Sequence, residues 1–336
     1  MSRLEKTMNA LTRSGTGILA ADESNKTIAK RLESIHLKST PESRYAYRQL
    51  LLSTPNLSKY ISGVILYDET IQQDGPNGPL RQLAKGYEIG IKVDLGLEDL
   101  PFCDHEKITK GLDDLGQRLT HYKSLGATFT KWRNVFRISD STPSMTAVTA
   151  NCEVLARYAA IAQQHDFIPI VEPEVLLDGN HSIEDCAATT SRVLNTLFNA
   201  LSMHQVDLSL MILKPNMVVP GLSSGIPFDA DLAAQWTIST FMNHVPAAVR
   251  SINFLSGGLS PENAYETLKK INEIGGWLPW RMSFSFARAL QEPCLDSWGG
   301  KPENTAKAQA KLIEFAKKNC ECLAEIADTE SIAEPA

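Results

Sequence analysis

Short, almost continuously apolar runs alternate with longer amphipathic stretches along most of the chain. Runs such as IPIV and LSLMIL are apolar on both faces, which is typical of strands covered by helices on both sides of a parallel sheet. The pattern predicts eight such strands, over Thr16–Ala20, Gly63–Tyr67, Glu88–Val93, Thr128–Trp132, Phe167–Val171, Leu208–Leu213, Ile252–Leu255 and Arg281–Phe286.

Amphipathic patterns between these runs predict helices, most clearly over Thr146–His165, Ser182–Met203 and Asn304–Ala327. Regular alternation of strand and helix indicates a parallel sheet, and eight repeats favour closure into a barrel. An open doubly wound sheet is the alternative, but no GxGxxG motif follows the first strand. We therefore predict an α/β fold, a single (β/α)₈ TIM barrel over residues 1–327, followed by a short polar tail over 328–336.

Composition narrows the class of protein. The chain has 336 residues, 43% of them hydrophobic and 21% charged, so a large core is possible. A formal net charge of −6 without a basic stripe argues against nucleic-acid binding. No apolar run approaches the roughly 20 residues of a membrane helix. Six scattered cysteines without a CxxC pair favour a reducing, cytoplasmic location, so we expect neither nucleic acid nor membrane as a partner.

The N-terminal segment MSRLEKTMNALTRSG is mildly basic and amphipathic, so it has to be weighed as a transit peptide. Leu4, Met8 and Leu11 repeat at helical spacing, and Glu5 interrupts the basic bias. The segment also leads directly into the first predicted strand. We therefore expect a helix that belongs to the fold.

Charged side chains close three consecutive predicted strands, where a TIM barrel carries its chemistry. Lys131, Glu172 and Lys214 stand at the ends of strands four, five and six, so they are expected to lie side by side. Each cation lowers the pKa of the other lysine, and burial lowers it further. A lysine that becomes a free amine can attack a carbonyl, while the glutamate transfers protons. The alternative is a structural layer of ion pairs without chemistry.

A candidate phosphate site follows strands seven and eight. The glycines of Ser256-Gly257-Gly258 allow backbone N–H groups to converge on an anion, and TIM barrels often bind phosphate at this place. Arg288, just after strand eight, adds a bidentate donor. The alternative is an ordinary glycine turn before the helix that begins near Pro261.

Further charged residues suggest a second anion site and a base. Lys92, Lys30 and Arg31 have the charge to bind a second anion, although Lys30 and Arg31 also fit the solvated face of a helix. Asp22, after the first strand, is a candidate for the base that deprotonates a sugar hydroxyl. Its alternative role is to cap the next helix.

Histidine positions bear on the question of metals. The chain has seven histidines, and none follows a predicted strand. Neither HxH nor HExxH occurs. We therefore predict that the site has no metal ligands.

Seven ordered motifs resemble class I fructose-1,6-bisphosphate aldolase. They are ILAADES at 18–24, GIKVD at 90–94, KWR at 131–133, VEPE at 171–174, LKPNMV at 213–218, FLSGG at 254–258 and RALQ at 288–291. The similarity extends from about Leu4 to the last helix. It implies a lyase that reversibly cleaves fructose 1,6-bisphosphate to dihydroxyacetone phosphate and glyceraldehyde 3-phosphate through a lysine Schiff base. It further implies that no cofactor or metal is needed, and that the protein is a homotetramer.

The resemblance also implies residue roles. Lys214 matches the Schiff-base lysine, Glu172 the acid–base residue, Lys131 the neighbouring cation and Asp22 the base for the C4 hydroxyl, with Glu174 in support. The residues that match phosphate-binding or adjacent positions are Ser256, Gly257, Gly258 and Arg288 for the C1 phosphate, Lys92 and Arg31 toward the other phosphate, and Arg133 as a supporting residue.

The chain departs from the family pattern at three places. Leu210 and Met211 stand where the family often has Glu-Gly, which we interpret as repacking that puts hydration of the site at risk, and FSFA at 284–287 replaces a tyrosine-rich turn. Many family members also end in a tyrosine that helps to protonate the enamine. Here no tyrosine follows Tyr265, so we expect that protonation step to be slow.

Two other functions remain as alternatives at the level of sequence. A transaldolase-like transferase would share the Schiff base without a second phosphate site. A scaffold protein with the same barrel would lack catalytic groups, yet Asp22, Lys131, Glu172 and Lys214 are all present. The sequence leaves open the preference among fructose 1,6-bisphosphate, fructose 1-phosphate and sedoheptulose 1,7-bisphosphate, and whether the protein serves glycolysis or gluconeogenesis.

Overall fold

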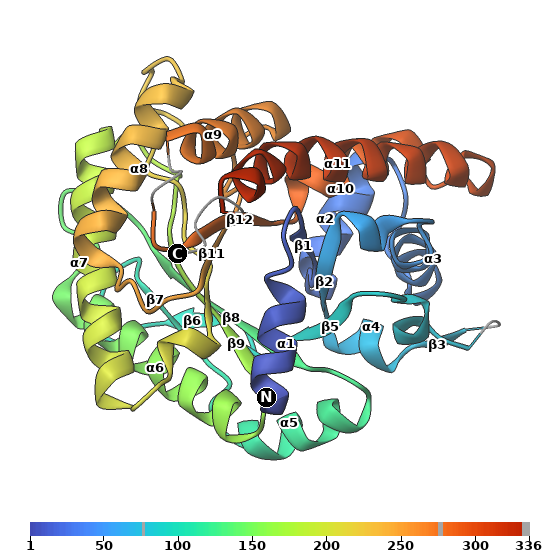
Figure 1. The fold of residues 1–336 in the computed structure, drawn as a ribbon, viewed down its shortest axis with the longest axis horizontal. Helices are drawn as coiled ribbons and strands as arrows, with labels where there is room; N and C mark the ends of the chain where they lie inside the picture. The colour runs from blue at the N-terminus through green and yellow to red at the C-terminus, as the bar shows by residue number, and fades with distance from the viewer. Residues whose placement is uncertain (76–77, 275–277, 331–336) are drawn as a thin grey trace, which may run out of the picture.

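Eight parallel strands close into a barrel surrounded by helices (Figure 1). The computed structural model describes residues 1–75, 78–274 and 278–330. The order of strands around the barrel is β1-β12-β11-β10-β9-β8-β5-β2, which confirms the predicted (β/α)₈ TIM barrel. The barrel strands are β1 (Gly17–Ala21), β2 (Ile61–Leu66), β5 (Glu88–Lys92), β8 (Phe129–Phe136), β9 (Ile168–Val175), β10 (Ile212–Leu213), β11 (Ser251–Phe254) and β12 (Arg281–Phe286).

The helices lie outside the strands and close one end of the barrel. They are α1 (Arg3–Leu11), α2 (Asn25–Ser34), α3 (Pro41–Leu52), α4 (Asp68–Gln72), α5 (Leu115–Ser124), α6 (Met145–Gln164), α7 (Ile183–Met203), α8 (Ala230–His244), α9 (Pro261–Ile274), α10 (Arg288–Trp298) and α11 (Thr305–Glu330). Two short antiparallel pairs, β3 (Asp74–Gly75) with β4 (Gly78–Pro79) and β6 (Leu97–Asp99) with β7 (Lys107–Thr109), were not predicted. Among the described residues, no helix is long and apolar enough to cross a membrane.

Two strands are longer than the sequence pattern predicted. β8 continues past Trp132 to Phe136, and β9 continues past Val171 to Val175. Their ladder is unbroken, with Arg133 opposite Glu172. Lys131 lies within its strand, as the predicted bounds require, whereas Glu172, predicted to follow its strand, also lies within it. Polar residues on these strands interrupt the apolar run without interrupting the backbone pairing.

The sixth predicted strand was also wrong in part. Leu208–Leu210 forms a 3₁₀ turn, and only Ile212–Leu213 pairs within the barrel. The Asp207 side chain accepts a hydrogen bond from the Ser209 N–H (2.9 Å), which supplies a local alternative to the strand ladder. The apolar run alone could not distinguish these two conformations.

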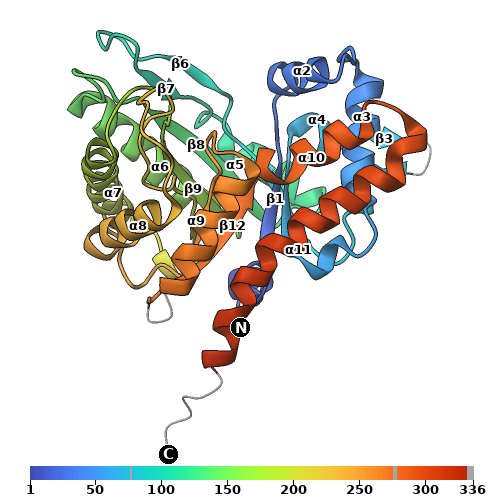
Figure 2. The ribbon, with the colours of Figure 1, turned by 90° about the horizontal axis from the view of Figure 1, so that it is seen from above.

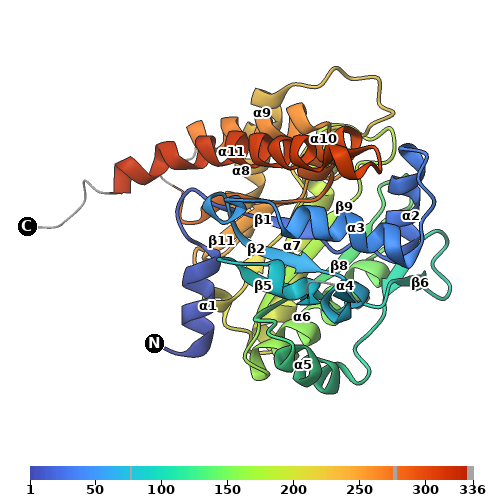
Figure 3. The same cartoon turned by 90° about the vertical axis from the view of Figure 1, so that its right-hand side faces the viewer.

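The N-terminal segment forms α1, as expected, and packs under the barrel. Ser2 and Glu5 form a capping box at its start. The Ser62 hydroxyl donates to the Leu11 carbonyl oxygen (2.8 Å), and Met8 and Leu11 join the apolar residues inside the barrel. Figure 3 shows α1 at the end of the barrel opposite α2 and β6. The end of the barrel beside α2 is not covered by α1, so it can hold a functional site.

The last helix runs along the outside of the molecule, where it packs on α9, α10 and α3 (Figure 2). Leu312, Ala316 and Leu323 are buried there, as their helical spacing predicts. α11 continues to Glu330, three residues into the polar tail predicted from residue 328. Residues 331–336 of that predicted tail lie outside the described residues.

Candidate active site

A cavity of about 500 Å³ opens at the carboxyl ends of the strands. This is the end at which TIM barrels carry their chemistry. Eleven of the twelve predicted site residues line it, from all parts of the chain: Asp22, Arg31, Lys92, Lys131, Arg133, Glu172, Glu174, Lys214, Ser256, Gly257 and Arg288. Gly258 lies beside it, because a Cβ at this glycine would be 3.6 Å from Nη2 of Arg288.

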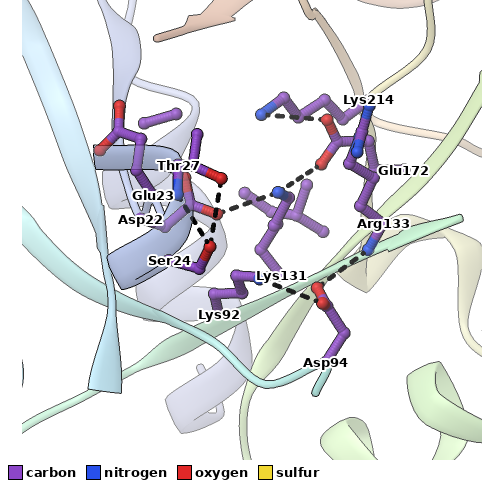
Figure 4. A network of polar contacts seen from close by, with 12 residues as sticks. Asp22, Glu23, Ser24, Thr27, Lys92, Asp94, Lys131, Arg133, Glu172 and Lys214 are labelled. Carbon is purple, nitrogen blue, oxygen red and sulfur yellow. Dashed lines mark hydrogen bonds and ion pairs between the residues drawn. The ribbon is translucent and has the colours of Figure 1, made fainter. Parts of the chain in front are cut away.

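A row of alternating charges crosses the floor of the cavity (Figure 4). Nζ of Lys131 lies 2.9 Å from Oδ2 of Asp22 and 2.9 Å from Oε2 of Glu172. Oε1 of the same glutamate lies 3.5 Å from Nζ of Lys214. All four side chains are buried. Lys131 thus bridges two carboxylates, whereas Lys214 stands at the end of the row with one longer contact.

The two lysines differ in their protonation. Burial would lower the pKa of Lys131, but the negative charges of Asp22 and Glu172 outweigh it and raise the pKa above the ordinary lysine value. For Lys214, burial lowers the pKa, and repulsion from Lys131 adds to this against the attraction of Glu172. Lys214 is therefore the lysine that more readily becomes a neutral amine.

The two carboxylates are held ionised. Burial would raise the pKa of Asp22, but Lys131, Lys214 and Lys92 outweigh it and hold the pKa well below its ordinary range. The pKa of Glu172 is also lowered, because Lys131 and Lys214 together outweigh its burial. An ionised Asp22 can accept a proton, and Glu172 can receive one from the Lys214 side and return it.

One end of the cavity has the features of an anion site. Gly257 and Gly258 have φ angles of 57° and 117°, so the turn needs residues without a Cβ. Arg288 begins α10, whose N-cap, Ala287, makes no side-chain cap. The Ser285 hydroxyl is buried, lines the cavity and has no hydrogen-bond partner within the described part of the chain. A bound anion would satisfy these donors together.

Sequence reasoning missed Ser285. It lies on β12 between two buried phenylalanines, Phe284 and Phe286. Side chains of a strand alternate between faces, so a serine at this position faces the interior when its neighbours pack against helices. The alternation F-S-F was therefore the available signal that Ser285 faces the barrel interior, but the segment had been interpreted only as a departure from the family pattern.

Two cations at the other end of the cavity are each paired with a carboxylate. Lys92 lies 3.2 Å from Asp94, while Arg133 pairs with Glu174. Lys30, which is exposed, also lines the cavity. These cations therefore face the cavity as predicted. The carboxylates paired with Lys92 and Arg133 offset part of their positive charge, so they weaken the attraction of these two cations for an anionic ligand.

The alternative role of Asp22 as a helix cap is wrong. Ser24 caps α2, accepting a hydrogen bond from the Thr27 N–H (3.4 Å). The Asp22 carboxylate, which follows β1, instead contacts Lys131 of β8 across the cavity. Because the Asp22 carboxylate does not cap the helix, it is free to accept a proton from a bound ligand.

The departures from the family pattern fit into the core. Met211 is fully buried, and Leu210 packs against the apolar residues inside the barrel. Phe284 and Phe286 are buried with their ring centroids 5.3 Å apart. In the described part of the chain, no group of three or more His, Cys, Asp or Glu side chains is arranged to hold a metal ion.

Comparison with known proteins identifies the family. The model of the family "Fructose-bisphosphate aldolase class-I" matches residues 3–333. "Fructose-bisphosphate aldolase 1" of Toxoplasma gondii is 47% identical over 312 residues, 91% of this chain and 86% of that protein. "Fructose-bisphosphate aldolase 4, cytosolic" of Arabidopsis thaliana is 46% identical over 310 residues, 91% of this chain and 79% of that protein.

A solved structure agrees in fold. Fructose-bisphosphate aldolase from Plasmodium falciparum, in a complex with TRAP and a small-molecule inhibitor, superposes with a TM-score of 0.93. It is 43% identical, and the match covers 96% of this chain and 94% of that one. The barrel, the charged row at its mouth and nearly the whole length of the sequence lead to one conclusion: this chain belongs to the class I fructose-bisphosphate aldolase family.

Proposed function

We propose that the protein reversibly cleaves fructose 1,6-bisphosphate to dihydroxyacetone phosphate and glyceraldehyde 3-phosphate through a Schiff base on Lys214. The observation that carries this proposal is the asymmetry of the charged row. Lys214 is buried, has a lowered pKa and stands 3.5 Å from a carboxylate that can transfer protons. These are the conditions in which a lysine amine attacks a ketone.

Imine formation uses Lys214 and Glu172. The neutral amine attacks C2 of the open-chain ketose, and the resulting carbinolamine has to lose its hydroxyl as water. Glu172, whose Oε1 faces Nζ of Lys214, passes the proton released by the attacking nitrogen to the carbinolamine oxygen. A second proton, taken up from solvent, then lets the hydroxyl leave as water. The product is a protonated imine and one water molecule. Its positive charge replaces the ammonium charge that Lys214 carried beside Glu172.

Bond cleavage uses Asp22. The ionised carboxylate takes the proton of the C4 hydroxyl, the C3–C4 bond breaks, and its electron pair moves into the protonated imine to give an enamine. The aldehyde leaves, C3 is then protonated and water hydrolyses the imine. Lys131 lies 2.9 Å from Asp22 and stabilises its charge throughout. Because the imine accepts the electron pair, we propose that the reaction needs no metal or cofactor.

The two ends of the cavity bind the two phosphates in this proposal. Ser256, the backbone of Gly257 and Gly258, and Arg288 bind the C1 phosphate. The Ser285 hydroxyl, which has no hydrogen-bond partner among the described residues, adds a donor. Arg31, Lys92 and Arg133 face the other phosphate, with Glu174 holding Arg133 in place. Two separated cationic ends fit a bisphosphate better than a monophosphate, which favours aldolase over the transferase alternative.

The biological setting follows the relatives. Several are named cytosolic or cytoplasmic, so we propose a cytoplasmic enzyme of sugar phosphate metabolism, in glycolysis or gluconeogenesis. We also propose one catalytic domain over residues 1–327 and, from the family resemblance, a homotetramer. Size-exclusion chromatography with light scattering tests the number of subunits.

Borohydride trapping tests the chemistry. The protein is mixed with dihydroxyacetone phosphate, reduced, digested and mapped by mass spectrometry, beside a sample treated with EDTA. We expect a reduced adduct on Lys214 in both samples. An adduct on Lys131 would exchange the roles of the two lysines, and the absence of any adduct in a folded protein would refute the Schiff base. Lys214→Met, which keeps the apolar bulk, is the control.

A further inference from the structure

Glu23 is a buried residue that lines the cavity but is not part of the charged row. It follows Asp22 in the chain, and successive side chains of an extended segment point to opposite sides. Figure 4 accordingly shows its carboxylate turned away from Lys131. Only 4% of the Glu23 side chain is exposed. Such a carboxylate needs partners of its own.

The carboxylate has three partners on three helices. Oε1 accepts from Arg31 of α2 and from Nε2 of Gln291 of α10, the latter at 2.9 Å. Oε2 lies 2.5 Å from Nη2 of Arg48 of α3. Gln291 is itself fixed, because its amide also donates to the Ala20 carbonyl and its oxygen accepts from the Tyr47 hydroxyl at 2.9 Å. Glu23 therefore stays in place whichever arginine contacts it.

Two guanidinium groups on one carboxylate leave a surplus positive charge. Arg48 is almost completely buried, whereas 18% of the Arg31 side chain is exposed. Arg31 also lines the cavity, whereas Arg48 lies behind it. Burial would raise the pKa of Glu23, but the two arginines outweigh it, so the carboxylate is ionised. If Arg31 leaves, each oxygen keeps one donor and the charge of Glu23 stays neutralised by Arg48.

We infer that Glu23 and Arg48 form a holding site for Arg31, from which its guanidinium moves to the substrate phosphate remote from Lys214 and to which it returns when product leaves. The inference rests on the proposed function for the identity of the ligand. Arg31 is the phosphate ligand, and Glu23 and Arg48 are positioning residues. A dianionic phosphate offers Arg31 a stronger partner than a carboxylate that another cation already neutralises.

The surplus cation makes a specific prediction for Arg48. In Arg48→Gln, Glu23 keeps a hydrogen-bond donor but has only Arg31 as a counter-ion, so Arg31 is held more tightly. We expect the KM for fructose 1,6-bisphosphate to rise about tenfold, within the usual range of coupling between sites. The KM for fructose 1-phosphate, which has no second phosphate, stays unchanged. Arg48→Lys keeps the charge and is the matched control, with both KM values near wild type.

A double-mutant cycle with Arg31 separates this coupling from a general loss of structure. In an Arg31→Met background, Arg48→Gln should leave the ratio of the two KM values unchanged. An equal rise of both KM values in Arg48→Gln, or a further change of their ratio in the Arg31→Met background, would overturn the inference.

A second variant and a non-reacting ligand keep the test independent of catalysis. Glu23→Gln/Arg48→Gln removes both charges of the buried pair, so Arg31 has no holding carboxylate and should bind a hexitol 1,6-bisphosphate at least as tightly as wild type. Weaker binding would mean that Glu23 only orients Arg31, and the inference would be wrong. Calorimetry with hexitol 1,6-bisphosphate and hexitol 1-phosphate measures this without a ketone. A failure of borohydride trapping would refute the proposed function while this binding result still decided the role of Glu23.

Discussion

Replacing each lysine of the charged row by methionine should have opposite effects on stability. Lys131 makes two ion pairs of 2.9 Å with buried carboxylates, and its pKa is raised. Lys214 makes one contact of 3.5 Å, and its pKa is lowered. A raised pKa means that folding favours the lysine charge, and a lowered pKa means that folding disfavours it. Methionine removes the charge in both cases while keeping apolar bulk.

The expected sizes follow from these contacts. Lys131→Met leaves Asp22 and Glu172 buried with Lys214 as the remaining cation of the row, and breaking a buried ion pair in this way costs about 3–5 kcal/mol. Lys214→Met leaves Lys131 bridging both carboxylates and removes a charge that burial disfavours. Its free energy of unfolding at pH 7 should therefore equal or exceed that of wild type. This difference should shrink as pH rises toward the ordinary lysine pKa of 10.5.

Urea unfolding followed by tryptophan fluorescence measures both variants, since the chain has five tryptophans. Equal protein concentrations keep any contribution from assembly constant. Activity should be lost in both variants, so activity alone cannot distinguish the two lysines. A loss of several kcal/mol in Lys214→Met, or unchanged stability in Lys131→Met, would refute the assignment of the bridging and reacting lysines.

Three further predictions concern other parts of the site. Because the pKa values of Asp22 and Glu172 are lowered, their contribution to stability is complete above the ordinary carboxyl values of 3.8 and 4.5. It is lost progressively as pH falls from these values toward the lower folded values. Urea unfolding between pH 7 and about pH 2 should show this loss, and Asp22→Asn should reduce its slope. Ser285→Ala removes a hydroxyl with no partner in the described structure, so the free energy of unfolding should change by less than about 0.5 kcal/mol. The KM for fructose 1-phosphate, measured by steady-state kinetics, should rise severalfold. An unchanged KM would contradict the phosphate-binding role of Ser285. Gly257→Ala places a Cβ 2.8 Å from Cδ1 of Leu255 at a residue whose φ is 57°. We therefore expect thermal unfolding to show about 1–2 kcal/mol of destabilisation. Calorimetry with inorganic phosphate should show weaker binding.

The barrel could be predicted from the sequence because its strands are buried on both faces. Apolar runs such as IPIV are enough to locate a parallel strand, and the helices between them have one buried face each. The ends of the strands were harder, since β8 and β9 continue through charged residues that face the cavity. Hydrophobicity stops at Trp132, but backbone pairing with the neighbouring strand does not.

The main residues of the site could also be predicted, because neighbouring strands of a barrel place their side chains together. What the sequence could not provide is the difference between Lys131 and Lys214, which depends on contacts of 2.9 and 3.5 Å. Arg48 was missed for a related reason. It lies within α3, 25 residues after Glu23, and nothing in its local sequence indicates a buried ion pair.

The charge balance of the mouth explains why so many ion pairs surround one reacting amine. Three cations that line the cavity also contact a carboxylate: Lys92 with Asp94, Arg133 with Glu174 and Arg31 with Glu23. Without these carboxylates, several partly buried positive charges would repel one another before substrate arrived. With them, the field at Lys214 depends mainly on Lys131 and Glu172, which act in opposite directions on its pKa. The paired cations remain available to a dianionic phosphate, so substrate binding can be strong while the amine stays reactive.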